Sequence, residues 1–283
     1  MKIGISGLGL IGGSLAKAYK RSLGYTVYGY DIDKSITQLA FIDGVIDGEL
    51  NGKTIGECDC ILIALYPKAA CEYLEMIAHF ISKDALVMDC CGTKRVICEK
   101  GFSLSCKYGF TFVGGHPMAG AHLSGYKNSR ATLFDGAPMV IVPKVFDDIS
   151  LLDRIKKALS PMRFGNINAV TAEKHDEIIA FTSQLAHIVS NAYIKSPTAI
   201  NHKGISAGSY KDLTRVAKLN PIMWTELFIE NRNNLILELD FLINNLSKYK
   251  DMLVKEKPNE LCTLLEEGST QKRKVSQHEK RKS

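Results

Sequence analysis

A glycine-rich turn at the extreme N-terminus constrains the fold of this chain more than any other feature. The motif reads G-x-G-x-x-G, and its expected cofactor contacts are Gly7, Gly9, Leu10, Ile11 and Gly12. It follows the strand-like run Lys2–Ser6 and precedes a helix-compatible segment. The first glycine permits a tight turn, the second lets a pyrophosphate approach the backbone, and the third lets helix pack on strand. We predict a dinucleotide-binding unit, with a turn used only for packing as the alternative.

A carboxylate follows where the ribose of the adenosine would lie. The second strand-like run, residues 26–31, ends in Asp31, 19 residues beyond Gly12. An acid at this position accepts hydrogen bonds from both ribose hydroxyls and repels a 2′-phosphate. The next residues, Ile32 and Asp33, provide no Arg that could attract such a phosphate. We therefore expect NAD rather than NADP as the cofactor.

Short β-rich runs alternate with amphipathic helical patterns through the first 170 residues, which is typical of an α/β sheet with crossover helices. The runs are mostly apolar throughout, as expected of strands buried on both faces. They are residues 2–6, 26–31, 60–65, 86–89, 111–113, 139–142 and 166–170. Beyond them long helical patterns take over, at residues 172–195 and after an N-cap at Asn220. We predict an α/β Rossmann-like dinucleotide-binding domain over residues 1–170 and an all-α dimerisation domain over residues 171–267.

The helical half needs a large partner surface. Leu235, Leu239, Leu242 and Leu246 recur at helical spacing in a stretch without Pro or Gly. A second copy of the same domain can provide that surface, so we expect a homodimer. Residues 268–283 carry six Lys or Arg against one Glu, and we predict that this basic tail is disordered.

Charge and cysteine content narrow the class further. The net charge is +6, but the tail accounts for most of it, so the preceding part is nearly neutral and no nucleic-acid partner is expected. The eight cysteines show neither CxxC nor a Cys/His metal spacing, so no metal site is expected, and their apolar surroundings fit reduced thiols in a cytoplasmic protein. Uncharged apolar stretches stay below the roughly 18 residues of a membrane span, so no membrane contact is expected.

A glycine-flanked histidine marks the candidate chemistry. The segment Gly114-Gly-His116-Pro-Met-Ala-Gly directly follows a strand-like run, and the carboxyl ends of such strands face the ligand in open α/β sheets. Histidine can accept a hydroxyl proton while hydride leaves the same carbon. His116 is therefore the candidate general base, with a purely structural histidine as the alternative.

Several motifs in order make the chain, from Met1 to about Glu266, resemble the prephenate and arogenate dehydrogenases of tyrosine biosynthesis. They are the glycine turn, the His116 segment, Ser124-Gly125, His175-Asp176, Ser183-Gln-Leu-Ala-His187, Lys211-Asp-Leu-Thr-Arg215 and Asn220-Pro-Ile-Met-Trp224. The resemblance implies an NAD-dependent oxidative decarboxylation of prephenate to 4-hydroxyphenylpyruvate. Arogenate, which would give tyrosine directly, is the close alternative. The histidine matching His116 would polarise the C4 hydroxyl of the ring, with Thr93 at the same end.

The same resemblance assigns the substrate side. The arginine matching Arg215 binds a substrate carboxylate, which suits a bidentate guanidinium and a dianionic substrate. Lys211 is a second cationic candidate, and His187 matches a position near cofactor and substrate. His122 and Ser124 are further candidates for substrate contact.

Two other interpretations of these residues compete with an NAD-dependent dehydrogenase. His175 and Asp176 could suggest a metal-dependent hydrolase, but adjacent residues on a helix point about 100° apart. A non-enzymatic module could sense NAD and touch a polyanion through the basic tail. Such a sensor would need neither His116 as a base nor Arg215 as a carboxylate clamp, so these residues favour an enzyme.

Overall fold

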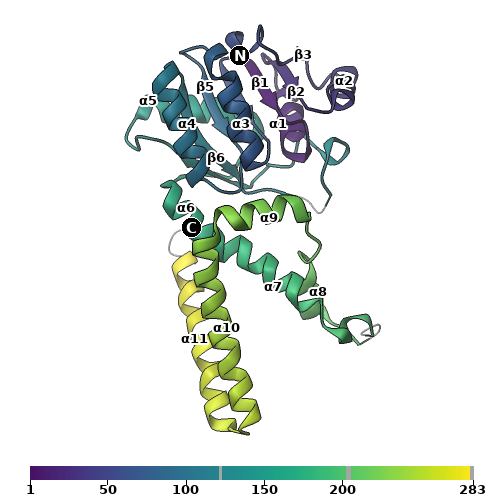
Figure 1. Cartoon of the computed structure of the whole chain (residues 1–283), viewed down its shortest axis with the longest axis vertical. Helices are drawn as coiled ribbons and strands as arrows, with labels where there is room; N and C mark the ends of the chain where they lie inside the picture. Colours follow the sequence, from purple (N-terminus) through teal and green to yellow (C-terminus); the bar gives the residue numbers. More distant parts are fainter. Residues whose placement is uncertain (121–122, 202–204, 281–283) are drawn as a thin grey trace. The chain divides into compact units, whose positions relative to one another are not determined.

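The computed structural model describes residues 1–120, 123–201 and 205–280. It consists of two compact units, Met1–Arg232 and Asn233–Ser283. The first unit is built on an eight-stranded sheet of order β3-β2-β1-β4-β5-β6-β7-β8 (Figure 1). Its strands are β1 (Lys2–Ser6), β2 (Thr26–Tyr30), β3 (Gly48–Glu49), β4 (Cys60–Ile63), β5 (Leu86–Asp89), β6 (Thr111–Pro117), β7 (Pro138–Val142) and β8 (Asn166–Ala169). All strand pairs are parallel except β6 with β7. The predicted α/β Rossmann-like sheet is confirmed.

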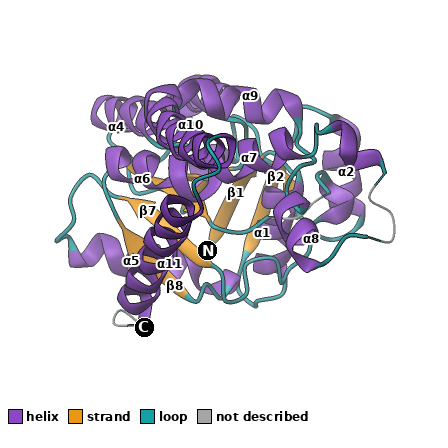
Figure 2. Cartoon of the chain, turned by 90° about the horizontal axis from the view of Figure 1, so that it is seen from below, coloured by secondary structure: helices purple, strands orange, loops and turns teal. Residues whose placement is uncertain are grey.

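Helices cover both faces of this sheet, as Figure 2 shows from below. They are α1 (Leu10–Lys20), α2 (Lys34–Ile42), α3 (Pro67–Ile77), α4 (Arg95–Tyr108) and α5 (Ile149–Leu159). Alternate residues of a strand point to opposite faces, and β4 illustrates the rule. Cys60 and Leu62 join the core under α1 and α5, whereas Ile61 and Ile63 join the core under α3 and α4. Such two-sided burial explains the continuous apolar runs in the sequence.

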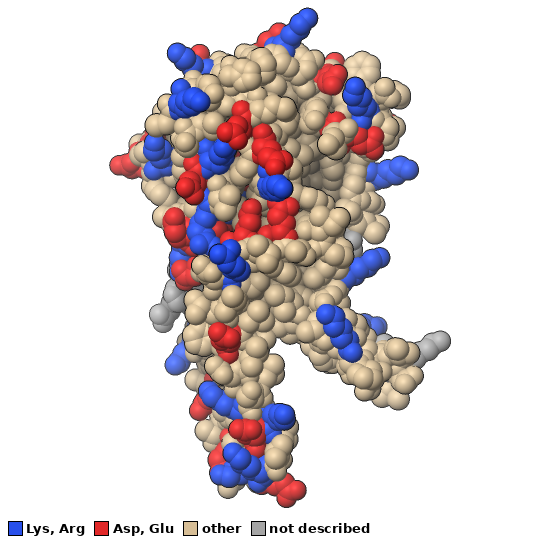
Figure 3. Space-filling view, viewed as in Figure 1, with Lys and Arg blue, Asp and Glu red and all other residues tan. Residues whose placement is uncertain are grey.

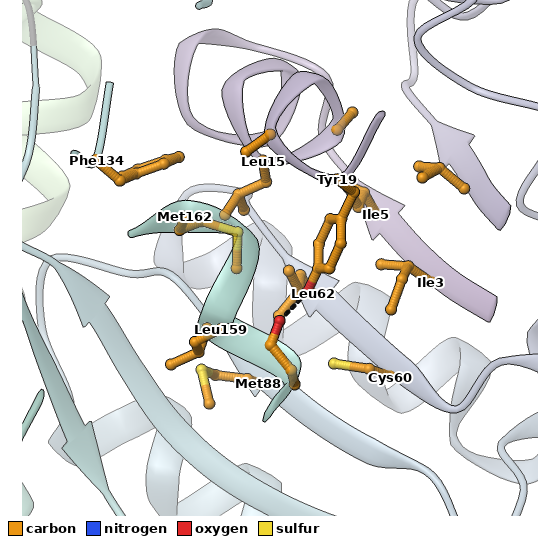
Figure 4. Close-up of a cluster of buried hydrophobic side chains, with 14 of the residues drawn as sticks. Ile3, Ile5, Leu15, Tyr19, Cys60, Leu62, Met88, Phe134, Leu159 and Met162 are labelled. Carbon is orange, nitrogen blue, oxygen red and sulfur yellow. Dashed lines mark hydrogen bonds between the residues drawn. The ribbon is translucent and has the colours of Figure 1, made fainter. Parts of the chain in front are cut away.

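A tyrosine packs in the core between α1 and α5. Tyr19 is fully buried, and its hydroxyl donates to the Ala158 carbonyl oxygen at 2.8 Å (Figure 4). This bond satisfies the phenolic group, so the ring can pack with Leu15 and Met162 without leaving an unpaired hydroxyl. The glycine turn at the start of α1 is thereby anchored to a rigid part of the molecule.

The helices beyond the sheet are α6 (Ala172–Ile179), α7 (Ala186–Tyr193), α8 (Gly208–Thr214), α9 (Pro221–Glu230), α10 (Arg232–Val254) and α11 (Pro258–Lys280). The helix predicted over residues 172–195 is interrupted by a π-helical turn at Ala180–Leu185. The long helix predicted after Asn220 breaks at Asn231, whose buried side chain bonds other segments instead of facing solvent. α6 and α9 contact α4 and α3 respectively, so the first unit extends beyond residue 170.

The second unit is a pair of helices, α10 and α11, joined by a short turn at Glu256. The Tyr249 hydroxyl donates to the Leu264 carbonyl oxygen at 3.2 Å across the pair. The predicted disorder of the tail was wrong as far as Lys280, because α11 continues through it. After Gly268 this segment has no Pro or further Gly and is rich in Lys, Arg and Gln, which favour helix. The rest of the predicted tail, residues 281–283, lies outside the described residues.

Surface charge and thiols follow the expectations from composition. On the face seen in Figure 3, acidic and basic side chains are both spread over the α/β part. All eight cysteines are free, and burial raises the pKa of Cys60 to about 12. Cys106 and Cys262 are the exposed ones. Within the described ranges we find no helix long and apolar enough to cross a membrane.

Candidate active site

The glycine loop between β1 and α1 is shaped by contacts that exclude side chains. Gly7 has a φ of +81°, and a Cβ there would lie 2.4 Å from the Ala64 carbonyl oxygen. A Cβ on Gly12 would lie 1.7 Å from the Gly7 carbonyl oxygen, because α1 packs directly on the turn. A Cβ on Gly9, in contrast, would meet no atom of the described residues within 4 Å. Gly9 therefore borders open space at the N-terminus of α1.

This open space has the properties of a pyrophosphate site. Gly9 is the N-cap of α1 and offers no side-chain cap, so the first amides, including those of Leu10 and Ile11, remain available to an anion. The helix dipole also favours negative charge at this end. The structure thus fits the phosphates of a dinucleotide at the predicted loop.

Asp31 follows β2 and faces the same loop. Its Oδ2 accepts from the Leu8 amide at 2.8 Å, and its Oδ1 accepts from the Asp33 amide at 3.0 Å. A carboxylate has about four lone-pair sites, so both oxygens can still accept ribose hydroxyls. The hydrogen bond to Leu8 ties the ribose-binding acid to the phosphate-binding turn, which places both parts of a dinucleotide site at one edge of the sheet.

His116 lies near the end of β6 and belongs to a chain of hydrogen-bonded side chains. Its Nδ1 lies 2.9 Å from Nε2 of His175, and Nδ1 of His175 lies 2.8 Å from Oδ1 of Asp176. His175 and Asp176 are buried on α6. An ionised Asp176 can only accept, so His175 donates from Nδ1 and accepts at Nε2. His116 must then donate from Nδ1, which leaves its Nε2 as a free lone pair.

Asp176 stays ionised because four donors face it. Besides His175, it accepts from the Lys94 amide at 2.7 Å, from the Arg95 amide at 3.0 Å and from Arg95 Nε at 3.1 Å. Burial alone would raise the pKa of Asp176, but these hydrogen bonds outweigh it and lower the pKa. The Asp176 carboxylate, at the end of this series of hydrogen-bonded side chains, is therefore held in place by the first turn of α4.

The two histidines are held neutral. Burial, the neighbouring ring of His175 and the positive charge of Lys94 together hold the pKa of His116 well below its ordinary 6.5. Burial also lowers the pKa of His175, although its hydrogen bond to Asp176 acts in the opposite direction. A neutral imidazole with a free Nε2 can accept a proton near neutral pH, which is the requirement for a general base.

A buried ion pair supports the strand ends beneath His116. The Lys94 ammonium donates to Asp89, and it also donates to the Gly115 carbonyl oxygen at 2.6 Å. Asp89 in turn accepts from the Gly115 amide at 3.0 Å and from the Cys91 amide at 2.8 Å. Burial would lower the pKa of Lys94, but the adjacent carboxylate of Asp89 raises it. Lys94 therefore stays charged, and the hydrogen bonds of Lys94 and Asp89 fix the backbone on which His116 stands.

Thr93 lies between this ion pair and helix α9. It is 2% exposed, and its Oγ1 donates to Oε2 of Glu230 at 2.5 Å. The residue after Thr93 provides the amide that Asp176 accepts. Thr93 and His116 are thus placed by one connected network at the carboxyl ends of β5 and β6.

Three of the predicted substrate residues, His187, Lys211 and Arg215, lie on the helical part of the first unit. His187 on α7 stacks on Trp224 of α9 with ring centroids 4.1 Å apart, and its Nδ1 donates to the Ser183 carbonyl oxygen at 2.8 Å. Burial lowers the pKa of His187, and the charge of Arg215 lowers it further, so the two residues share one electrostatic environment. Lys211 lies exposed on α8, one turn before Arg215.

Two further predicted residues belong to the connection after β6. Ser124 is exposed, and its carbonyl oxygen accepts from Nδ2 of Asn128 at 2.7 Å. His122 lies outside the described residues. Ser124 thus belongs to a surface turn.

Sequence reasoning missed the partners of the predicted site. The sequence suggests His175 and Asp176 only as metal ligands or as part of a family motif, yet the Asp176 carboxylate binds the imidazole of the preceding residue. Glu230 and the Lys94–Asp89 pair were not considered. A signal was available in Asp89 and Lys94, since two charged residues at the end of an apolar strand have to be paired when buried.

An α/β sheet with an open glycine loop, a ribose-type acid after β2 and a neutral histidine at the same edge defines a class, the NAD-binding oxidoreductases. Comparison with known proteins shows which family within this class the chain belongs to. The family model for the nucleotide-binding domain of prephenate dehydrogenase matches residues 15–165, and the model for its dimerization domain matches residues 171–267. The chain belongs to the prephenate dehydrogenase family.

Individual relatives agree with this assignment. The chain is 29% identical over 262 residues to a prephenate dehydrogenase of Bacillus subtilis, covering 89% of this chain and 70% of the relative. The crystal structure of an A. aeolicus prephenate dehydrogenase in complex with hydroxyphenyl propionate and NAD+ superposes with a TM-score of 0.81 at 27% identity, over 97% of this chain and 98% of that one. A Synechocystis arogenate dehydrogenase structure gives a TM-score of 0.79 at 26% identity, over 97% and 100% of the two chains.

Proposed function

We propose that this protein catalyses the NAD-dependent oxidative decarboxylation of prephenate to 4-hydroxyphenylpyruvate, a step of tyrosine biosynthesis. The observation that carries the proposal is the chain from Asp176 through His175 to His116, which leaves His116 Nε2 as an acceptor at the cofactor edge of the sheet. Membership of the family supplies the substrate class. When bound at the glycine loop, NAD+ supplies the acceptor for hydride.

His116 acts as the general base of the proposed reaction. Its Nε2 accepts a hydrogen bond from the C4 hydroxyl of the ring and takes the proton as hydride leaves C4. His175 and the carboxylate of Asp176 stabilise the imidazolium that forms, because Asp176 remains ionised. The ring carboxylate then departs as carbon dioxide, and the electron pair of its bond makes the ring aromatic. His116 returns the proton to the resulting phenolate oxygen, which regenerates the neutral base.

The helical residues orient the dianionic substrate. Arg215 offers a planar guanidinium for a carboxylate, and its charge already acts on His187. Lys211, one turn away, adds a second cation, while Ser124 and His122 remain candidates for side-chain contact. Thr93 stands at the hydroxyl and nicotinamide end, close in sequence to the amides that hold Asp176.

The direct test is the absorbance of NADH at 340 nm with purified protein, NAD or NADP, and either prephenate or arogenate. We expect NADH from NAD and prephenate, with His116→Asn lowering kcat by several orders of magnitude and changing substrate affinity much less. Arg215→Gln should mainly raise KM. Failure of both substrates with both cofactors would refute the proposed reaction.

Arogenate is the second candidate substrate, favoured by the similarity to the Synechocystis enzyme. The two substrates share the reacting ring and differ in having a keto or an amino side chain. The same assay separates them, since higher kcat/KM with arogenate than with prephenate would reverse the order proposed here. An NAD sensor that acts through the basic tail is tested by deleting residues 268–283. The enzyme should keep its turnover, and a large loss would favour the sensor.

We further propose that the protein works as a homodimer in the cytoplasm. The family model for residues 171–267 describes a dimerization domain, and α10 exposes large apolar side chains, among them Leu237 at 58% and Phe241 at 64%. Free cysteines agree with a reducing compartment. Light scattering should give the mass of two chains, and Phe241→Glu should give the mass of one. Lys250→Glu, an exposed position on the opposite side of the same helix, is the control. A monomeric wild-type protein would refute the dimer.

A further inference from the structure

Helix α9 presents two carboxylates and a leucine to the connections that follow β4 and β5. Oε1 of Glu226 accepts from the Lys68 amide in the first turn of α3 at 2.5 Å. A side chain on Gly92 would come within 3.1 Å of Leu227, so the leucine packs on the turn after β5. Glu230, four residues after Glu226, lies on the same side of the helix. α9 therefore reaches both connections at the edge of the sheet where the cofactor loop lies.

The end of α9 is fixed where Glu230 stands. The next residue, Asn231, is fully buried and donates from Nδ2 to the Asp176 carbonyl oxygen and to Gln184 Oε1, both at 2.8 Å. Arg95 Nη2 also donates to Oδ1 of Asn231 at 3.2 Å. These bonds connect Glu230 to the same segment that holds the histidine chain, so its carboxylate is a rigid partner for Thr93.

While Glu230 is ionised, Thr93 must be the donor and Glu230 the acceptor of their hydrogen bond. A carboxylate accepts and cannot donate, so the single hydroxyl proton of Thr93 points to Glu230. The separation of 2.5 Å is at the short end of the range for a hydroxyl bonded to a carboxylate. The lone pairs left on Thr93 Oγ1 can then only accept a hydrogen bond. Protonation of Glu230 would let it donate instead, and the Thr93 proton could turn outward.

We propose that Glu230 is a positioning residue that makes Thr93 Oγ1 an obligatory hydrogen-bond acceptor in the active site. The ligand group that it serves is a donor, the carboxamide N–H of the nicotinamide, because the single proton of the C4 hydroxyl already goes to His116. This inference rests on the proposed function, because it concerns the orientation of the reacting groups in that reaction. Ionised Glu230 is required, so turnover falls when it takes up a proton.

The surroundings of Glu230 place this protonation above the ordinary range of a glutamate. Burial raises the pKa of Glu230, the Thr93 hydrogen bond opposes this, and the negative charges of Glu226 and Asp176 raise the pKa further. The charged or titratable groups around it are Glu226 on α9, Asp176 on α6, Lys94 and Arg95 at the start of α4, and Cys71 on α3. Lys94 lowers the pKa of Glu230, but burial dominates.

The test compares pH profiles of kcat and kcat/KM for wild type, Glu230→Gln and Glu226→Gln, all as full-length protein. Glu230→Gln should lower kcat about 10- to 100-fold and remove the acid limb that belongs to Glu230. Glu226→Gln should retain the limb and shift it to lower pH, because a negative neighbour is lost. Thr93→Val should lower kcat by the same factor as Glu230→Gln, and the double variant should lower kcat no further than either single variant.

A second measurement is independent of turnover. Infrared titration should show a protonated-carboxyl band that is absent in Glu230→Gln and that appears at higher pH in Thr93→Val, since the Thr93 hydrogen bond lowers the pKa of Glu230. An active wild type whose acid limb persists in Glu230→Gln would refute the positioning role alone. An inactive wild type with both substrates would refute the proposed function, and the role of Glu230 would fall with it. A Glu230 band unaffected by Thr93→Val would refute the pair itself.

Discussion

Asp176→Asn is the sharpest test of the histidine chain, because it changes one charge and almost no volume. An asparagine has one acceptor oxygen and one donor group where Asp176 has two acceptors. With its oxygen toward His175, its NH2 group would face both the amide and Nε of Arg95, two partly buried donors. With its NH2 toward His175, only the Lys94 amide is opposed. The second orientation is therefore preferred, and it reverses the tautomer of His175 and then of His116.

The magnitude follows from the two bonds that must be restored before His116 can accept a proton. They are the 2.9 Å bond between the histidines and the 2.8 Å bond to residue 176. Forcing each donor against a donor costs about 1–2 kcal/mol in a buried site, or about 2–4 kcal/mol together. Since 1.4 kcal/mol is a factor of ten, kcat should fall roughly 30- to 1000-fold.

The assay is steady-state NADH formation at saturating NAD and prephenate, with thermal melting and NADH binding to show that the variant is folded. Glu177→Gln is the matched control, because Glu177 is the next residue on α6 and pairs at the surface with Lys174. The control should keep wild-type kcat. If folded Asp176→Asn keeps a kcat within threefold of wild type, the hydrogen bonds from Asp176 through His175 do not set the tautomer of His116.

Three further outcomes follow from the same contacts. Gly9→Val should leave the melting temperature nearly unchanged and raise KM for NAD at least tenfold, whereas Gly12→Ala should destabilise the protein, as thermal melts with and without NAD would show. Lys94→Met should lower the free energy of unfolding by about 3–5 kcal/mol in urea titrations, because its carboxylate partner stays buried without a counter-charge. His116 and His175 have lowered pKa values, so the unfolded chain binds more protons below pH 6.5, and the free energy of unfolding should fall between pH 7 and pH 5. Equal stability at both pH values would contradict the burial of these rings.

The sequence was most informative where local pattern decides structure. The glycine turn, Asp31 and the apolar strands were predicted because spacing and alternation depend only on neighbours in the chain. The position of His116 at a strand end followed from the same pattern. These features are enough to place a dinucleotide site and a candidate base at one edge of the sheet.

Contacts between distant segments could not be predicted in this way. Asn231 ends α9 because its side chain reaches Asp176 and Gln184, which are 55 and 47 residues away. Thr93 meets Glu230 across 137 residues. The helical tail was not predicted for another reason, because a run of charged residues is typical of disorder although Lys, Arg and Gln also favour helix.

The histidine chain also bears on how activity arises during synthesis. The glycine loop, Asp31 and His116 all lie in the first 116 residues, but the groups that decide which nitrogen of His116 carries its proton come from α6 and from the end of α9. Until those segments have packed against the sheet, the His116 imidazole is free to take either tautomer. The geometry of the general base is therefore complete only once the chain has been synthesised as far as residue 231.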